Sequence, residues 1–416
     1  MGHITSKNYL KLQERLDRNA QGAPMSEALM KILEILFTPD EAERVSHLPV
    51  RPFTVSDASQ RWKLSVEESQ TILNELADKG LLLDSEHDGV QKYVLPPTMA
   101  GFFEFSLMRN DGRFDRKLLS ELFYQYINVE DDFVAKALMQ KTSIARTFVH
   151  EQTLHQEEQS EILDYERASH IIDSATCITV GTCYCRHKME HVGKACRAPQ
   201  DVCLTFNGTA ASLSKHGIAK QITKEEAHAI LKRCVDYGLV QIGDNVQHKV
   251  NWICNCCGCC CEAILAYKKL GYKSKLSSSF FAAIDDENCI NCGLCVRQCP
   301  VEAISKINNQ TIVDQDKCIG CGVCARVCSK QAITIKHRDK KAFVPESSFE
   351  RCVLNAIERG KLAGYIFDNY DLWTNEMLRH LLSILLTLSG VKFILVNEQL
   401  KSRFLTQLRK MVEKYS

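Results

Sequence analysis

Apolar side chains recur at helical spacing soon after the start of the chain. The first such face consists of Ala28, Leu29, Ile32, Leu33 and Leu36, which predicts an amphipathic helix. A second helix is expected over 56–62. A third begins at Ser65, where a capping box with Glu68 precedes further apolar positions, and it ends before Gly80. Residues on either side of Asp88-Gly89 then predict a hairpin over 81–95.

This order of elements is typical of a winged-helix-like domain, which we expect over 26–97, after a polar, partly helical leader over 1–25. The would-be recognition helix is mostly acidic, with Glu67, Glu68, Glu75 and Asp78 against Lys79 alone. Phosphate neutralisation supplies most of the non-specific affinity for DNA, so this helix would repel the DNA backbone. We therefore expect a docking or dimerisation module and favour no nucleic-acid partner.

The rest of the sequence predicts further domains, and together they give an α+β multidomain fold. Residues 98–172 are expected to be helical throughout, as a connector. A cysteine-rich iron–sulfur domain is expected over 173–280 and a dicluster ferredoxin domain over 281–340, for reasons given below. Beyond these, strands at 363–367 and 391–396 would alternate with helices at 347–359, 374–389 and 398–414, which favours a small C-terminal α/β unit over 341–416.

Composition directs attention to the cysteines. The chain has 416 residues, with 52 basic against 51 acidic side chains, so its net charge recruits neither nucleic acid nor acidic lipid. No signal peptide pattern opens the chain, and the longest apolar run, 381–396, falls short of the roughly 18 residues that a spanning helix needs. We expect a soluble, cytoplasmic protein, in which its 21 cysteines serve mainly as metal ligands.

Eight cysteines form an internal repeat. The first run is Cys289, Cys292, Cys295 and Cys299, and the second is Cys318, Cys321, Cys324 and Cys328. Both have the spacing C-x2-C-x2-C-x3-C, and the segments DENCINCGLCVRQCPVEAIS and DQDKCIGCGVCARVCSKQAIT superpose cysteine on cysteine. In this spacing three thiolates wrap one cube and the fourth reaches its neighbour. We therefore assign Cys328 to the cluster of the first run and Cys299 to the cluster of the second.

These two runs resemble the bacterial-type two-cluster ferredoxins over about 285–336. The resemblance implies two [4Fe–4S] clusters and electron transfer. The alternative is zinc, whose usual signature is two separated C-x2-C pairs. Ser329 departs from the family, which often has proline there. A dry wall around the clusters is expected from Ile290, Val296, Ile304, Ile319, Val327 and Ile333.

A second cysteine-rich region precedes the repeat. Its first group is Cys183, Cys185, Cys196 and Cys203, interleaved with basic residues, and its second is Cys254, Cys256, Cys257, Cys259, Cys260 and Cys261. The simplest assignment places a third [4Fe–4S] cluster on the first group and a fourth on some four cysteines of the second. Alternatively, the two groups exchange ligands. Adjacent cysteines on an extended chain point to opposite sides and would face different clusters. Zinc is the alternative for the first group, and a structural or redox-active thiol cluster for the second.

The run CNCC-x-CCC also looks like a segment found beside ferredoxin domains in iron–sulfur proteins of anaerobic bacteria and archaea. Cys177, Cys234 and Cys352 stand alone, and we expect the last two to be buried small hydrophobes. The histidines at 187, 191, 216 and 248 are expected to be surface or hydrogen-bonding residues rather than ligands.

These patterns predict an iron–sulfur electron-transfer protein, as a subunit of a cytoplasmic oxidoreductase in an anaerobe. No glycine-rich nucleotide loop occurs, so flavin or nicotinamide would belong to a redox partner such as a flavoprotein, hydrogenase or dehydrogenase. One alternative is a reductase with an open iron site at 254–261, although no catalytic acid–base pair is recognisable. The other is a redox-sensing winged-helix regulator.

Overall fold

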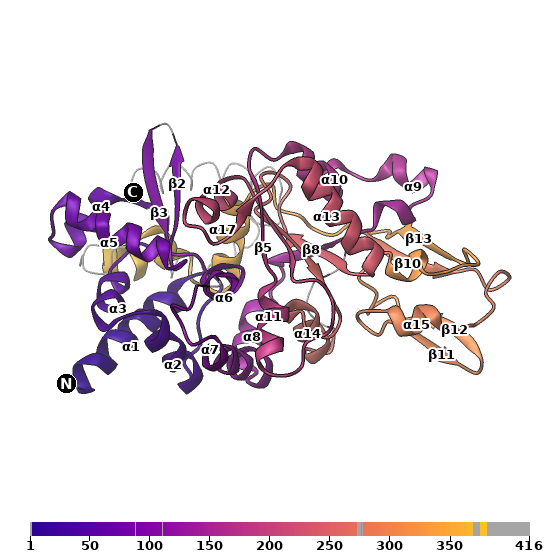
Figure 1. Cartoon of the computed structure of the whole chain (residues 1–416), viewed down its shortest axis with the longest axis horizontal. Coiled ribbons are helices and arrows are strands. Elements are labelled where there is room, and N and C mark those ends of the chain that lie inside the picture. The colour runs from indigo at the N-terminus through magenta and orange to yellow at the C-terminus, as the bar shows by residue number, and fades with distance from the viewer. Residues whose placement is uncertain are drawn as a thin grey trace. The chain divides into compact units, whose positions relative to one another are not determined.

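The computed structural model describes residues 2–87, 89–109, 111–272, 276, 278–368 and 375–380. Helices and several small sheets make up two compact units, each described by itself below (Figure 1). One unit combines Met1–Phe103 with the chain from Phe349 onward, and the other is Glu104–Ser348. The mixture of helices and sheets agrees with the expected α+β class. None of the helices within the described residues is long and apolar enough to cross a membrane.

The first unit begins with helices around a small sheet. Its elements up to the unit boundary are α1 (Gly2–Arg18), α2 (Glu27–Leu36), α3 (Pro39–Ser46), β1 (Phe53–Thr54), α4 (Val55–Trp62), α5 (Val66–Asp78), β2 (Leu83–His87), β3 (Val90–Val94) and the π-helical turn η1 (Thr98–Phe102). The sheet has the order β1-β3-β2 and is antiparallel. The apolar face of α2 is buried and the capping box of α5 is present, so both predictions are confirmed.

The N-terminal helix is part of this unit's core. In α1 the side chains of Tyr9, Leu12 and Leu16 are buried, and the helix packs against α2 and α3. The Tyr9 hydroxyl donates a hydrogen bond to the Phe37 carbonyl at 2.7 Å. The polar segment expected to be a leader therefore contributes an apolar face, because helical spacing collects its few apolar residues on one side.

The C-terminal part of the first unit differs from the prediction. After α17 (Ser348–Glu358), the segment expected to be a strand at 363–367 forms helix α18 (Leu362–Ile366). Leu362 and Ile366 are four residues apart and are buried together with Ala20, Val353 and Ala356. A helix places residues four apart on the same face, so both side chains can be buried in this core. The expected helix at 374–389 is helical over the described 375–380, and the expected elements at 391–396 and 398–414 lie outside the described residues.

The second unit is built on a six-stranded antiparallel sheet of order β4-β8-β9-β6-β5-β7. Its strands are β4 (Ala145–Phe148), β5 (Ile178–Thr182), β6 (Asp201–Phe206), β7 (Lys220–Gln221), β8 (Val240–Asp244) and β9 (Trp252–Cys256). Strand β4 lies in the connector expected to be wholly helical, so that prediction is wrong there. All four residues of β4 are buried, and so short a run carries no alternation that would reveal it.

Helices and turns surround this sheet. They are α6 (Phe103–Met108), α7 (Arg116–Phe123), η2 (Tyr124–Val129), α8 (Asp132–Leu138), η3 (Glu151–Thr153), α9 (Gln156–Glu161), η4 (Asp164–Glu166), α10 (Ala168–Ser174), α11 (Tyr184–His191), α12 (Asn207–Lys215), α13 (Lys224–Tyr237) and α14 (Glu262–Lys269). Helix α13 has a capping box at Thr223 and Glu226 and a left-handed Gly238 at its end, both of which are local sequence signals. The loop after α11, with Cys196, and the turn after β9, with Cys257, lie side by side.

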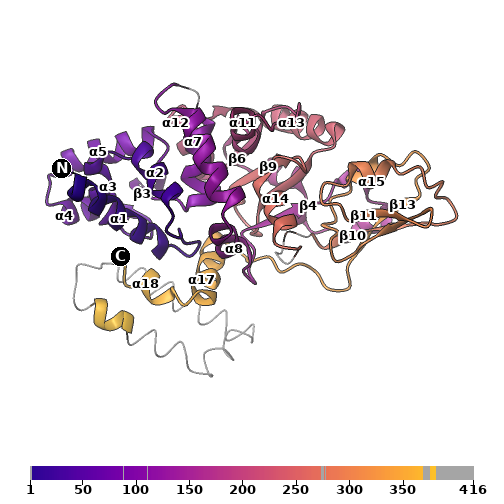
Figure 2. The ribbon, with the colours of Figure 1, turned by 90° about the horizontal axis from the view of Figure 1, so that it is seen from below.

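The cysteine repeat forms two small antiparallel sheets of two strands each. Strand β10 (Phe280–Ile284) pairs with β13 (Ile333–His337), and β11 (Ile304–Ile307) pairs with β12 (Gln310–Val313). Two short helices, α15 (Leu294–Gln298) and α16 (Val323–Arg326), carry the third cysteine of each run, Cys295 and Cys324. Figure 2 shows α15, β10, β11 and β13 together at one end of the unit. The two halves of the repeat therefore adopt matching structures.

Candidate metal centres

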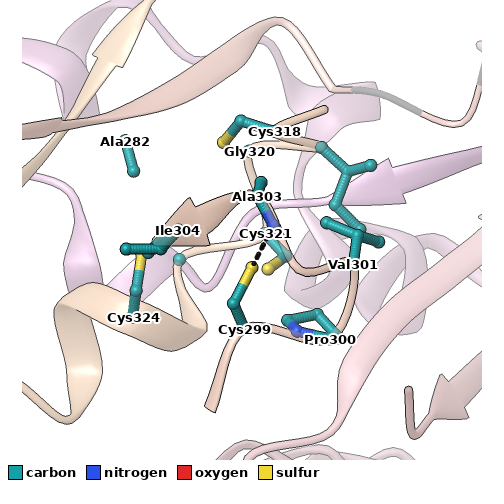
Figure 3. A pocket seen from close by; sticks show the side chains of 12 residues that line it. Ala282, Cys299, Pro300, Val301, Ala303, Ile304, Cys318, Gly320, Cys321 and Cys324 are labelled. Atoms are coloured by element: carbon teal, nitrogen blue, oxygen red, sulfur yellow. Dashed lines mark hydrogen bonds between the residues drawn. The ribbon is translucent and has the colours of Figure 1, made fainter. Parts of the chain in front are cut away.

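One hollow in the repeat is lined by the second cysteine run together with the last cysteine of the first. Its thiols are Cys299, Cys318, Cys321 and Cys324, and its empty volume is about 320 Å³ (Figure 3). Val301, Ile304 and Ile319, all buried, form part of its wall. The structure thus brings Cys299 to the second run, as the spacing leads one to expect.

The other hollow has the reciprocal composition. It is lined by Cys289, Cys292, Cys295 and Cys328 and has an empty volume of about 400 Å³. This hollow is more open to solvent, because Cys292 is exposed and Ile290 is 60% exposed. Ile290 is therefore not part of a dry wall, in contrast to the prediction, whereas Ile333 is buried as expected.

Around the hollow that contains Cys299, two backbone segments come very close to each other. Gly320 and Gly322 have φ of +68° and +84°, and a Cβ on Gly320 would lie 2.2 Å from the Phe280 carbonyl oxygen. Only glycine fits at such a position. The Ala303 N–H donates to Cys299 Sγ at 3.2 Å, which is the kind of amide contact that stabilises a cluster thiolate.

Burial raises the pKa of Cys299, Cys321 and Cys324 above that of an ordinary thiol. In a dry cavity the charged thiolate is disfavoured unless a metal compensates it. Four convergent thiols around a hollow fit a [4Fe–4S] cluster at both positions, and an amide donor is present at the one that contains Cys299.

Six upstream cysteines meet in what we call the six-thiol group: Cys183, Cys185, Cys203, Cys254, Cys256 and Cys261. Each thiol lies within hydrogen-bonding reach of two others, so that the contacts close a ring. Cys183 directly precedes α11 and Cys261 directly precedes α14, while Cys203 is on β6 and Cys254 and Cys256 are on β9. The sheet and two helix starts thus hold the group together.

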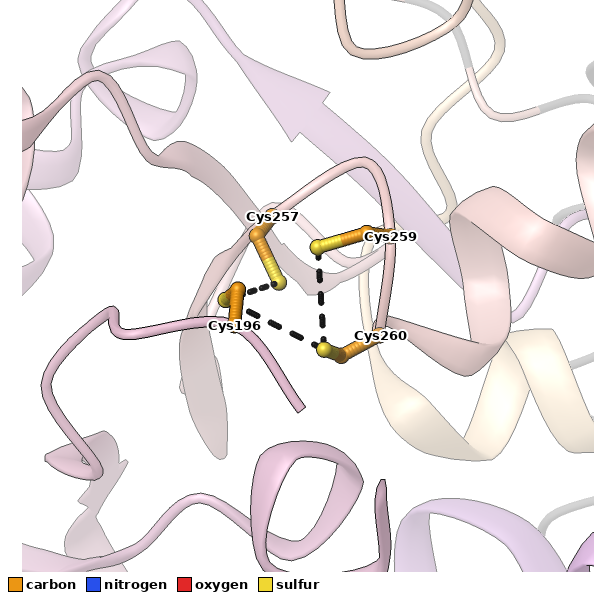
Figure 4. Close-up of side chains that lie close together, drawn as sticks. All are labelled: Cys196, Cys257, Cys259 and Cys260. Carbon is orange, nitrogen blue, oxygen red and sulfur yellow. Dashed lines mark hydrogen bonds between the residues drawn. The ribbon is translucent and has the colours of Figure 1, made fainter. Parts of the chain in front are cut away.

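The other four upstream cysteines form the four-thiol group: Cys196, Cys257, Cys259 and Cys260 (Figure 4). Their sulfur atoms all lie within 4.8 Å of one another. The simplest assignment grouped Cys196 with Cys183, Cys185 and Cys203. In the structure Cys196 instead lies with Cys257, Cys259 and Cys260. The alternative, in which the two sequence groups exchange ligands, describes the arrangement.

Arg186 lies between the two groups, and sequence reasoning singled it out only as one of several interleaved basic residues. Its side chain is buried, and Nη1 donates to the Asn255 carbonyl at 3.0 Å and approaches Cys257 Sγ at 3.8 Å. Burial lowers the pKa of Arg186, but the negative charge of nearby cysteine sulfurs, chiefly Cys183 and Cys203, has a larger opposite effect. The pKa of Arg186 is therefore raised. Its Nε and Nη2 have no hydrogen-bond partner among the described residues. Buried free donors of a guanidinium fit an anionic cluster.

A buried ion pair holds the two ligand-bearing helices together. Lys188 of α11 contacts Glu262 of α14, and the two side chains are 0% and 4% exposed. Asn128 Nδ2 donates to the same carboxylate at 2.7 Å. Burial lowers the pKa of Lys188 to about 8. The spacing of cysteines carries no signal for this pair, which only the packing of α11 on α14 creates.

The isolated cysteines and histidines belong to neither thiol group. Cys234 is fully buried, as expected, and burial raises its pKa to about 12. Cys352 is only partly buried, in contrast to the prediction. His187 contacts the Leu107 carbonyl at 2.8 Å and His191 at 3.2 Å, so it has the hydrogen-bonding role that we expected.

Comparison with known proteins places one part of the chain. A family model described as a 4Fe-4S dicluster domain matches residues 282–342. A search of curated proteins found no significant match. A search of solved structures likewise found none. Residues 282–342 are thus a ferredoxin-type 4Fe-4S dicluster domain, and the protein is an iron–sulfur protein with [4Fe–4S] cofactors.

Proposed function

We propose that this chain is an electron relay, acting as a subunit of a cytoplasmic oxidoreductase in an anaerobe. The observation that carries the proposal is the pair of adjacent hollows, each lined by four cysteines that include one from the other half of the repeat. A [4Fe–4S] cluster supplies reversible uptake of one electron at a time. The residues of this chain hold one site among buried apolar side chains and the other nearer to solvent.

The upstream cysteines support a longer relay. Cys256 and Cys261 of the six-thiol group share one apolar core with Cys295, Cys318 and the other buried ligands of the dicluster domain. Gly258 packs on Pro300, where a Cβ would lie 2.6 Å from the carbonyl oxygen of Pro300. Because Pro300 directly follows Cys299, the upstream loop contacts the domain beside a ligand. We assign a third [4Fe–4S] cluster to four of the thiols in the six-thiol group.

The more open hollow is the exit that we assign to the relay. Ile290, Ile307 and Ile312 are 60%, 53% and 45% exposed, and Ile290 lines that hollow together with Cys292. Exposed apolar residues beside a redox site suit the docking of a partner protein. A flavoprotein, hydrogenase or dehydrogenase would supply or accept the electrons.

The iron and acid-labile sulfide of the anaerobically purified chain test this proposal. We expect about eight of each in the dicluster domain and about four more upstream, reducible in one-electron steps that are followed by electron paramagnetic resonance. Cys183→Ser should remove only the upstream iron, and Cys177→Ser, a cysteine outside both groups, should remove none. A colourless protein, or one whose iron is not reducible, would refute the relay. A wild-type protein with only about eight sulfides per chain would remove the third cluster from it.

We infer that residues 26–97 act as a winged-helix-like docking module rather than a DNA reader. The order of α2, β1, α4, α5 and the hairpin β2–β3 supports such a module. The acidic residues of α5 are exposed, and Lys79 is paired with Glu41 at 2.5 Å. We expect no retention of DNA in a gel-shift assay even at low salt, and binding that weakens with salt would contradict this inference.

A further inference from the structure

The sulfur atoms of the four-thiol group lie close together, all within 4.8 Å of one another. Cys196 Sγ lies 3.6 Å from Cys257 Sγ and 3.9 Å from Cys260 Sγ, and Cys259 Sγ lies 3.7 Å from Cys260 Sγ (Figure 4). Cys260 is buried and Cys259 is exposed. The group therefore lies at the edge of the unit, with its sulfurs turned toward one point.

These distances match the geometry of a single ion. Four sulfurs that each lie about 2.3 Å from one zinc ion, at the corners of a tetrahedron, are about 3.8 Å from one another. The thiolates of a [4Fe–4S] cluster instead bind different iron atoms at separate corners of a cube, which keeps them further apart. Four sulfurs that all lie within 4.8 Å of one another leave too little room for a cube between them, whereas each thiol of the six-thiol group reaches only two of the other five.

The dicluster domain provides a comparison within the same chain. There, each set of four cysteines surrounds a hollow, of about 320 Å³ in one case and about 400 Å³ in the other. In the four-thiol group the sulfurs lie within 4.8 Å of one another. The same fold thus presents two kinds of tetrathiolate site.

We propose that Cys196, Cys257, Cys259 and Cys260 bind one divalent metal ion, zinc or a lone iron, in a tetrahedral site that is separate from the [4Fe–4S] clusters. Binding converts four thiols and the ion into a tetrathiolate complex of net charge −2 and releases four protons to solvent, without any change of oxidation state. Arg186, whose Nη1 lies 3.8 Å from Cys257 Sγ, offsets part of that charge.

The position of the site indicates what the ion does. Cys196 comes from the loop after α11, and the other three ligands come from the turn before α14. Gly258, within that turn, packs on Pro300 of the dicluster domain. The ion therefore fixes two loops, 61 residues apart at Cys196 and Cys257, against the domain that carries the clusters. This role goes beyond the proposed relay and does not depend on it.

Metal analysis of the full-length, anaerobically purified protein tests the site. We expect one zinc ion, or one iron atom in excess of the cluster iron, per chain. X-ray absorption at the zinc edge should show four sulfur neighbours at about 2.3 Å. For iron, Mössbauer spectroscopy should show a separate tetrahedral high-spin component. A wild-type protein with no such ion would overturn the proposal.

Two variants and a control locate the ion. Cys196→Ser and Cys260→Ser should each lose the single ion and keep the cluster iron and sulfide, whereas Cys177→Ser should keep both. Loss of about four iron atoms with their sulfide from Cys196→Ser would mean a cube in place of the single ion, and would overturn the proposal. If a variant does not fold, the absorption spectrum of the wild-type ion decides. Failure of the relay would appear in the reducible iron, which is measured separately.

Discussion

Neighbouring cysteines in the loop after β9 belong to different thiol groups, and the local backbone geometry explains why. Cys256 is the last residue of β9 and belongs to the six-thiol group, whereas Cys257 belongs to the four-thiol group. Alternation along an extended chain separates this pair as expected. Cys259 and Cys260 lie in a turn, so alternation does not apply, and both join the four-thiol group.

Gly258 is the residue at which this loop contacts the dicluster domain. In Gly258→Ala the new Cβ would lie 2.6 Å from the Pro300 carbonyl oxygen and 3.0 Å from its Cα. Because backbone atoms cannot yield easily, we expect a loss of about 1–3 kcal/mol in the free energy of unfolding. Chemical denaturation, followed by the visible absorption of the clusters, measures it. Gly208→Ala is the control, since nothing lies within 4 Å of its Cβ, and an equal loss in both variants would contradict the argument.

At the scale of elements, two helices begin at the six-thiol group. Cys183 precedes α11 and Cys261 precedes α14, and the Lys188–Glu262 pair links the two helices within the core. A buried pair need not add stability over apolar residues, but removal of one partner leaves the other charge buried and uncompensated. The pair thus fixes which faces of α11 and α14 meet, and with them the positions of the thiols.

Lys188→Met should therefore lower the free energy of unfolding by about 3–5 kcal/mol, because Glu262 remains buried without its cation. Loss of upstream iron should accompany this change. Lys232→Met is the matched control, since Lys232 and Asp236 form an exposed pair on α13 that contributes little. A double variant, Lys188→Met with Glu262→Leu, should recover much of the loss. Denaturation midpoints of the four proteins check this, and a single variant as stable as wild type would refute it.

At the scale of the whole molecule, chain order and compact units do not coincide. The first unit contains both ends of the described chain, because the segment from Phe349 joins residues 1–103. Ala20 is buried with Val353, Ala356, Leu362 and Ile366. Arg51 also pairs with Asp368 at 3.3 Å, with side chains 6% and 4% exposed. The iron–sulfur unit is therefore inserted, in sequence, between two halves of another unit.

Asp368→Asn tests this arrangement in the full-length chain. It removes the charge that faces Arg51 but keeps the side-chain volume, so we expect the first unit to lose about 3 kcal/mol of stability. Hydrogen–deuterium exchange should locate the change in residues 1–103 and 349–368 and leave the dicluster domain as in wild type. Glu27→Gln, which breaks an exposed pair with Lys31, should leave exchange unchanged. Equal effects in both variants would show that the buried pair does not join the two segments.

The sequence alone determined the chemistry of the dicluster domain. Ligand spacing there is local and repeated, so the eight cysteines and their exchange between halves can be read from the chain, and so can α2, α5 and α13 from their caps and apolar faces. Tertiary structure alone decided the grouping of the ten upstream cysteines, the strand at Ala145–Phe148 and the helix at Leu362–Ile366. In each of these cases, partners far away in the chain set the outcome, because a short segment takes the conformation that its packing neighbours stabilise.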